Sequence, residues 1–127
     1  MNILLDTNRY TDFCRGESSA VEIMRKARTV YIPFIAIAEL RAGFACGRQG
    51  PHNEQILTRF LARPRVSMLF ADEETTRQYA NLFRQLRTQG TPVPENDLWI
   101  AALAVQHDLF LCTRDAHFSR LPQIPVV

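Results

Sequence analysis

The stretch Ile3-Leu4-Leu5-Asp6-Thr7-Asn8 is the part of the sequence from which the fold can be predicted. Three consecutive apolar residues that end at an acid are typical of a short strand buried on both faces, as in a parallel sheet. Further along the chain, similar short apolar runs alternate with amphipathic stretches of helical period. This alternation predicts βαβ units and therefore an α/β fold around a central parallel sheet of four or five short strands.

The same patterns give expected bounds for the other elements. After the strand at 3–5, the apolar runs predict strands at 30–32, 66–70 and 109–112, with 126–127 as an added edge strand. The expected helices cover 19–27, 35–46, 51–63, 72–89 and 96–107, and a short turn covers 115–118. A capping box is expected at the start of the first of these helices, from Ser19 and Glu22. The expected N-caps of the last two are Asp72 and either Asn96 or Asp97. Two glycines, Gly47 and Gly90, are expected to end helices.

Length and composition are ordinary for one globular domain, which we expect to span residues 1–127. The chain is 46% hydrophobic and 22% charged, and no apolar run approaches the ~18 residues of a membrane span. The three scattered cysteines are each expected to be small buried side chains. Reduced cysteines and a first segment unlike a signal peptide favour a cytoplasmic location for the protein. A net charge of +2 is too small to indicate nucleic acid by itself. All basic residues except Lys26 are arginine, which suits phosphate; codon bias explains this preference equally well.

Four acids lie where a parallel sheet places its ligands, at or near the carboxyl ends of strands. Asp6 follows the first strand and Asp115 follows the fourth. Glu39 is a lone acid in an apolar helix, one turn before Gly43, and a close approach at that glycine would justify its cost in a helix. Asp97 shares a helix face with apolar residues and so is expected to point inward. Each acid alone has a structural alternative, namely a helix cap, an exposed side chain, or a turn aspartate paired with Arg114.

Together the four acids predict a metal site. Carboxylates about 4 Å apart repel by roughly 4 kcal/mol at an effective dielectric of 20, so the group needs a cation or a shared proton. Carboxylate oxygens without soft ligands suit Mg²⁺ or Mn²⁺. Such an ion at a sheet edge suggests phosphate chemistry, in which it activates water. None of His52, His107 and His117 has metal-ligand spacing, and all three are expected to be structural or exposed.

Four short motifs resemble those of the PIN-domain nucleases, and among them the VapC-type toxins of bacterial toxin–antitoxin pairs. They occur in family order along the whole chain, as Leu5-Asp6-Thr7-Asn8, Glu39-Leu40-Arg41-Ala42-Gly43, Asn96-Asp97-Leu98-Trp99-Ile100-Ala101 and Thr113-Arg114-Asp115-Ala116-His117-Phe118. The resemblance implies a three-layer α/β/α domain. It also implies that Asp6, Glu39, Asp97 and Asp115 form the catalytic site, in which Asp6, Asp97 and Asp115 hold Mg²⁺ or Mn²⁺ and Glu39 acts mainly through water.

The resemblance also implies the roles of the neighbouring residues and the partners. Side chains that orient the acids would be Thr7, Asn8, Asn96 and Thr113, and side chains that grip RNA would be Arg41, Arg48 and Arg114; a solvated helix face is an equal alternative for Arg41 and Arg48. The family cuts single-stranded parts of RNA, such as transfer or ribosomal RNA loops, leaving a 5′-phosphate and a 3′-hydroxyl. The resemblance further implies a homodimer that is located in the bacterial cytoplasm and does not bind a membrane. A cognate antitoxin would block the active site, and the complex would bind promoter DNA through the antitoxin.

One departure and two alternatives remain. The family continues with apolar residues after Asp6-Thr7-Asn8, whereas this chain has Arg9 and Tyr10, which can alter the groove or the dimer face. The alternatives are a catalytically idle PIN fold that only binds RNA or a partner, and a housekeeping RNA-processing nuclease without an antitoxin. A dinucleotide-binding fold is excluded because no glycine-rich turn follows the first strand, and a receiver domain because the only lysine comes too early.

Overall fold

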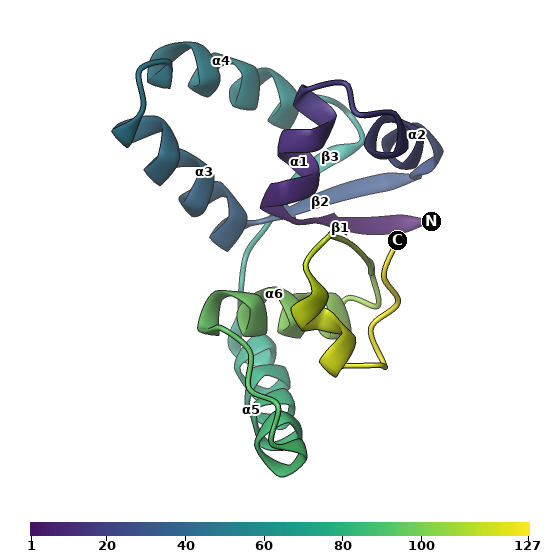
Figure 1. Ribbon diagram of the computed structural model, residues 1–127. Helices are drawn as coiled ribbons and strands as arrows, with labels where there is room; N and C mark the ends of the chain where they lie inside the picture. The colour runs from purple at the N-terminus through teal and green to yellow at the C-terminus, as the bar shows by residue number, and fades with distance from the viewer.

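The computed structural model describes all residues 1–127 and has three layers, with a central sheet between two groups of helices (Figure 1). The sheet has four parallel strands, β1 (Asn2–Leu5), β2 (Thr29–Pro33), β3 (Val66–Leu69) and β4 (Phe110–Cys112), in the order β3-β2-β1-β4. The helices are α1 (Thr7–Cys14), α2 (Ser18–Lys26), α3 (Phe34–Cys46), α4 (Gly50–Leu61), α5 (Glu73–Gln89) and α6 (Glu95–Gln106), followed by the 3₁₀ helix η1 (Ala116–Arg120). The expected α/β fold with a parallel sheet is confirmed.

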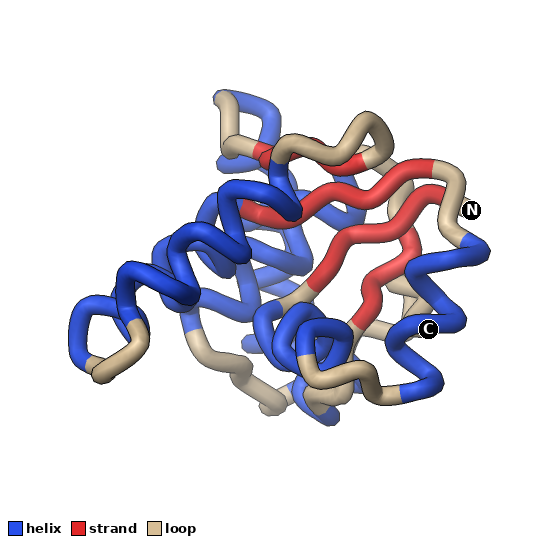
Figure 2. The backbone as a smooth tube through the Cα atoms, turned by 90° about the horizontal axis from the view of Figure 1, so that it is seen from above, coloured by secondary structure: helices blue, strands red, loops and turns tan.

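Strand β1 shows why the sheet is covered on both faces. Successive side chains of a strand point to opposite faces, and all three apolar residues of β1 are fully buried. Ile3 and Leu5 pack in one core with α1 to α4, while Leu4 packs in the second core with α5, α6 and η1. Figure 2 shows the four strands between these helices. The uninterrupted apolar run of the sequence therefore follows from the need to fill two cores.

The strand order reverses beside β1. The chain passes from β1 through β2 to β3 on one side and then crosses over to β4 on the other side. Ligands of open parallel sheets bind at such a reversal, outside the carboxyl ends of the strands. Leu5 pairs with Cys112, and the Asp6 backbone N–H donates to the Cys112 carbonyl oxygen at 3.0 Å. The residues that follow β1 and β4 are thus neighbours at this edge.

Several local expectations were wrong at helix ends. Ser19 and Glu22 form no capping box; α2 begins one residue earlier, and Glu17 is its N-cap and accepts from the Ser19 and Ala20 backbone N–H groups. Helix α6 has Pro94, not Asn96 or Asp97, as its N-cap, and no side-chain hydrogen bond caps this end. Helix α1 is absent from the helices expected above, although N-capping by Asp6 was one role open to that residue.

Two further expectations concern strands and glycines. No fifth strand forms, since Val126 makes only an isolated parallel bridge to Leu111. Gly90 ends α5 in the left-handed region with φ 72°, as expected, and Asp72 caps the start of that helix. Gly47 ends α3 with an ordinary φ of −97°.

None of the helices is both long and apolar enough to cross a membrane.

Candidate active site

Four carboxylates from four segments face one another at the carboxyl edge of the sheet. Asp6 follows β1, Glu39 lies in the middle of α3, Asp97 is in the first turn of α6, and Asp115 precedes η1. Each of Asp6, Glu39 and Asp97 has its pKa raised partly by the negative charge of other members of this group. We call these four residues the acid cluster. Acids that are up to 109 residues apart in the sequence are thus brought into one site.

Asp6 is the most enclosed member of the acid cluster, with 5% of its surface exposed. Its Oδ1 accepts from the Thr7 backbone N–H at 2.8 Å, so it also caps α1. Its Oδ2 accepts from the Thr113 hydroxyl at 2.8 Å and, more weakly, from the Asn8 amide at 3.5 Å. Burial raises the pKa of Asp6 most, the hydrogen bonds of Thr113 and Thr7 oppose this, and the charge of Asp115 adds to it.

Glu39 lies at the exposed rim of the site, and its Oε1 accepts from the Thr7 hydroxyl at 3.3 Å. Partial burial and then the charge of Asp6 raise the pKa of Glu39, while the Thr7 and Asn96 side chains lower it. The close approach expected at Gly43 is absent, since a Cβ at that position would meet no atom within 4 Å. That part of the argument for Glu39 was wrong, and its place in the site rests on its neighbours in α1 and α6.

Asp97 points inward from α6, as its apolar helix face predicted, and its side chain is 15% exposed. Ile100, Ala101 and Ala104 on the same face are buried. Burial raises the pKa of Asp97 most, the hydrogen bond with His117 lowers it, and the charges of Asp115 and Asp6 raise it further. The opening turn of α6 therefore carries a carboxylate held against other carboxylates.

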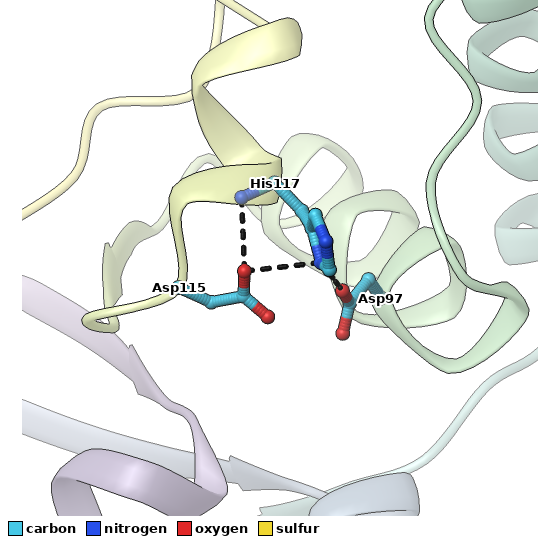
Figure 3. A group of neighbouring side chains, drawn as sticks. All are labelled: Asp97, Asp115 and His117. Atoms are coloured by element: carbon cyan, nitrogen blue, oxygen red, sulfur yellow. Dashed lines mark hydrogen bonds and ion pairs between the residues drawn. The ribbon is translucent and has the colours of Figure 1, made fainter.

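His117 was missed as a site residue by the sequence analysis. Its Nδ1 lies 2.9 Å from Asp97 Oδ2 and 3.0 Å from Asp115 Oδ1 (Figure 3). Its backbone N–H also donates to Asp115 Oδ1 at 2.9 Å. The expectation that all three histidines are structural or exposed holds for the exposed His52 and His107. The missed signal was the spacing Asp115-x-His117 directly after a strand, which brings both side chains back to the sheet edge.

The residues expected to orient the acids lie in or beside the acid cluster. Thr7 and Thr113 donate to Glu39 and Asp6 respectively, and the Asn8 amide reaches both Asp6 and Thr113. Asn8 Oδ1 also accepts from the Arg114 backbone N–H at 3.1 Å. Asn8 thereby joins the start of α1 to the loop after β4, which carries Asp115.

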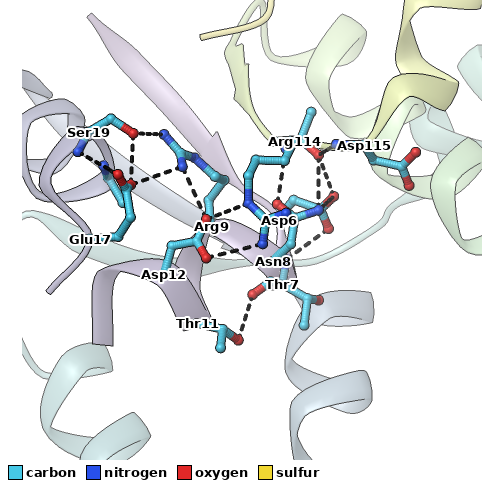
Figure 4. A network of polar contacts seen from close by, with 12 residues as sticks. Asp6, Thr7, Asn8, Arg9, Thr11, Asp12, Glu17, Ser19, Arg114 and Asp115 are labelled. Atoms are coloured by element: carbon cyan, nitrogen blue, oxygen red, sulfur yellow. Dashed lines mark hydrogen bonds and ion pairs between the residues drawn. The ribbon is translucent and has the colours of Figure 1, made fainter. Parts of the chain in front are cut away.

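A second polar network joins α1, the start of α2 and the loop after β4. Arg9, only 7% exposed, donates to Asp12, Glu17 and the Ser19 hydroxyl. Asp12 in turn accepts two hydrogen bonds from the Arg114 guanidinium, at 2.6 and 3.1 Å (Figure 4). Arg9, which stands where the resembling family has an apolar residue, therefore links α1 to α2 and, through Asp12, to the loop after β4.

The three arginines expected to contact RNA have different surroundings. Arg41 is paired with Glu54, with an N–O distance of 2.8 Å, and Arg114 is paired with Asp12. Both side chains are about half exposed, at 49% and 57%, so their pairs are open to solvent. Arg48 is exposed in the turn between α3 and α4.

The expectation of buried cysteines holds only for Cys112, because Cys14 and Cys46 are exposed.

The chemistry of the donor set fits a divalent cation. Four carboxylates share one site, and no guanidinium or ammonium group forms an ion pair with any of them; His117 is the sole basic partner. Asp97, Asp115 and His117 each offer a ligand atom, and these atoms all lie within 4.8 Å of one another. Burial and the charges of neighbouring carboxylates both raise the pKa values of Asp6, Glu39 and Asp97, and a bound cation would offset both effects.

Comparisons with known proteins agree on one family. The sequence matches the PIN domain over residues 3–124. The chain is 31% identical to the VapC ribonuclease Y4jK of Sinorhizobium fredii, over 89% of this chain and 86% of that protein. It is 34% identical to the ribonuclease VapC1 of Haemophilus influenzae, over 98% and 95%. A solved structure of VapBC2 from Rickettsia felis, bound to a DNA fragment from its promoter, superposes with a TM-score of 0.86 at 27% identity, covering 100% of this chain and 98% of that one.

Proposed function

Since this chain belongs to the PIN domain family, and within it to the VapC ribonucleases, we propose that it is a metal-dependent endoribonuclease and the toxin of a toxin–antitoxin pair. The observation that carries the proposal is the acid cluster, in which four carboxylates share the sheet edge and the pKa values of Asp6, Glu39 and Asp97 are raised, mainly by burial. A catalytically idle fold would have no need to keep such a repulsive group. The housekeeping alternative has the same site and differs only in lacking an antitoxin.

We assign the metal ligands to Asp6, Asp97 and Asp115, and the ion to Mg²⁺ or Mn²⁺. The chemistry that such an ion supplies when bound is activation of a water and compensation of charge on the scissile phosphodiester. Glu39 is at the exposed rim, where it can accept a proton from an attacking water. Thr113 and the Thr7 backbone N–H keep Asp6 oriented through hydrogen bonds of 2.8 Å each. Attack by water on the phosphorus, with departure of the 3′-oxygen, would give the proposed 5′-phosphate and 3′-hydroxyl ends.

The proposed partners follow from the relatives. The R. felis structure contains VapBC2 on promoter DNA, and a structure of VapBC-1 from H. influenzae is similarly related at 25% identity. We propose that this chain likewise binds a cognate antitoxin and forms a homodimer, and that the antitoxin complex binds promoter DNA. We also propose that residues 1–127 act as a single domain in the bacterial cytoplasm. The RNA substrate would be a single-stranded loop of transfer or ribosomal RNA, contacted in part by Arg41, Arg48 and Arg114.

The test compares the purified chain with Asp6→Asn on total cellular RNA, with Mg²⁺, with Mn²⁺ and with a chelator. Asn is as good an N-cap as Asp, so this variant removes the charge and keeps the cap of α1. Glu22→Gln, at a partly exposed acid that pairs with Arg25 on α2, is the matched control. We expect discrete fragments that need metal, are absent with Asp6→Asn and persist with Glu22→Gln. If wild type and Asp6→Asn behave alike under every condition, the idle alternative replaces the proposal.

A further inference from the structure

His117 is placed as a nitrogen donor between two carboxylates of the acid cluster. The imidazole comes from η1, Asp97 from α6, and Asp115 from the residue before η1 (Figure 3). The Nδ1 distances of 2.9 Å to Asp97 Oδ2 and 3.0 Å to Asp115 Oδ1 are nearly equal. Nδ1 is therefore hydrogen-bonded to Asp97 and lies at almost the same distance from an oxygen of Asp115.

Hydrogen bonding alone leaves this arrangement incomplete. An imidazole Nδ1 carries at most one hydrogen, so it can donate well to only one of two carboxylate oxygens. Asp115 Oδ1 already accepts from the His117 backbone N–H. The distances from Nδ1 to the two carboxylate oxygens equal those between neighbouring ligand atoms of a metal ion. Two adjacent ligands of an octahedral ion, each about 2.1 Å from the metal, lie about 3.0 Å apart. Three donor atoms within 4.8 Å of one another fit such a set.

We propose that His117 is a ligand, through Nδ1, of the divalent ion held by Asp97 and Asp115, and that the site therefore prefers Mn²⁺ to Mg²⁺. The inference rests on the proposed function, because it concerns the ion of that same site. Mg²⁺ takes oxygen ligands almost exclusively, whereas imidazole nitrogen suits first-row transition ions. Ligation through Nδ1 uses the tautomer with its proton on Nε2. The His117 side chain is 40% exposed, so water can hydrate that N–H.

The test is pulsed electron paramagnetic resonance of Mn²⁺ bound to the full chain. A directly ligated imidazole couples its nitrogen nucleus to the Mn²⁺ spin. We expect this nitrogen coupling in the wild type and in His107→Ala, an exposed histidine at the end of α6, and its loss in His117→Ala. Calorimetry on the same proteins should show the Kd for Mn²⁺ rising at least tenfold in His117→Ala. The Kd for Mg²⁺, measured likewise, should rise less than threefold.

The outcomes separate this inference from the proposed function. If Mn²⁺ binds and cleavage needs metal, but the wild type shows no nitrogen coupling, His117 only orients the carboxylates and the inference alone is refuted. Equal weakening of Mg²⁺ and Mn²⁺ in His117→Ala also refutes it, provided circular dichroism shows the variant folded. If the wild type binds neither ion, both the inference and the metal dependence of the proposed nuclease are wrong.

Discussion

Thr113→Val removes one hydroxyl that joins three parts of the acid cluster. The Thr113 hydroxyl donates to Asp6 Oδ2 at 2.8 Å, accepts from the Asp115 backbone N–H at 3.0 Å, and accepts more weakly from the Asn8 amide at 3.4 Å. Valine has nearly the same shape and keeps the packing. Thr113→Ser keeps the hydroxyl and loses only the methyl group. The pair of variants therefore separates the polar contacts of a side chain that is 6% exposed from its packing.

The expected magnitude follows from the two shorter contacts. The bond to the charged Asp6 contributes about 1.5–3 kcal/mol and the neutral bond from the Asp115 N–H about 1 kcal/mol, so Thr113→Val should lower the free energy of unfolding by about 2.5–4 kcal/mol at neutral pH. Thr113→Ser should cost about 1 kcal/mol for one buried methyl group. The Thr113 bond lowers the pKa of Asp6 because it stabilises the carboxylate. The gap between the variants should therefore shrink as the pH falls and Asp6 becomes protonated.

The assay is urea unfolding of both variants in chelator, from pH 7 down to below 3.8, the ordinary pKa of an aspartate. Metal titrations at pH 7 add a second measurement. Loss of a group that orients a ligand costs roughly 10- to 100-fold in metal affinity, so Thr113→Val should bind divalent ions that much more weakly than Thr113→Ser. Equal stability of the two variants at neutral pH would refute the reasoning, because the hydroxyl would then have no role that its methyl group lacks.

Three other changes give separate checks. Burial raises the pKa of Asp6, so the metal-free folded protein binds the proton more tightly than the unfolded chain and loses stability as the pH rises above 3.8. Urea unfolding in chelator should therefore favour Asp6→Asn over wild type increasingly from pH 3.8 to 7, and a constant difference would contradict this. Gly43→Ala, in an open helical position, should raise the free energy of unfolding by about 0.5–1 kcal/mol without altering RNA cleavage. Phe118→Ala, at a side chain that is 1% exposed, should cost about 3–5 kcal/mol in thermal unfolding, and Phe118→Leu should cost much less.

The sequence was sufficient for the sheet and for the convergence of the acids, for a physical reason. A run such as Ile3-Leu4-Leu5 can be buried on both faces only in the middle of a layered sheet, so the acid after it must lie at the carboxyl edge. Asp72 and Gly90 mark the ends of α5 because capping is a local effect of the residue itself. Both ends of α5 were therefore predicted well, whereas the N-caps of α2 and α6 were not.

Features that depend on contacts between residues far apart in the sequence were not predicted. Ser19 does not cap α2, and its hydroxyl instead donates to Glu17 and accepts from Arg9, which lies on α1. The role of His117 depends on α6, which is separated from it by β4, and spacing rules for metal ligands look only along one segment. Periodicity also gave no account of the exposed Cys14 and Cys46, since a thiol is tolerated at the surface as well as in the core.

The charge arrangement around the acid cluster explains how a repulsive group is kept ready for a cation. Arg9 and Arg114 both lie within a few residues of the acids in sequence, and either could have neutralised them. Instead Asp12 accepts from both guanidinium groups, and Glu17, whose pKa is lowered to about 2 chiefly by its bond from Ser19, also accepts from Arg9. Two carboxylates outside the site thus hold the nearby arginines away from the acid cluster. The buried charge of Asp6 is left for an ion from solvent, and the same contacts hold the loop that carries Thr113 and Asp115.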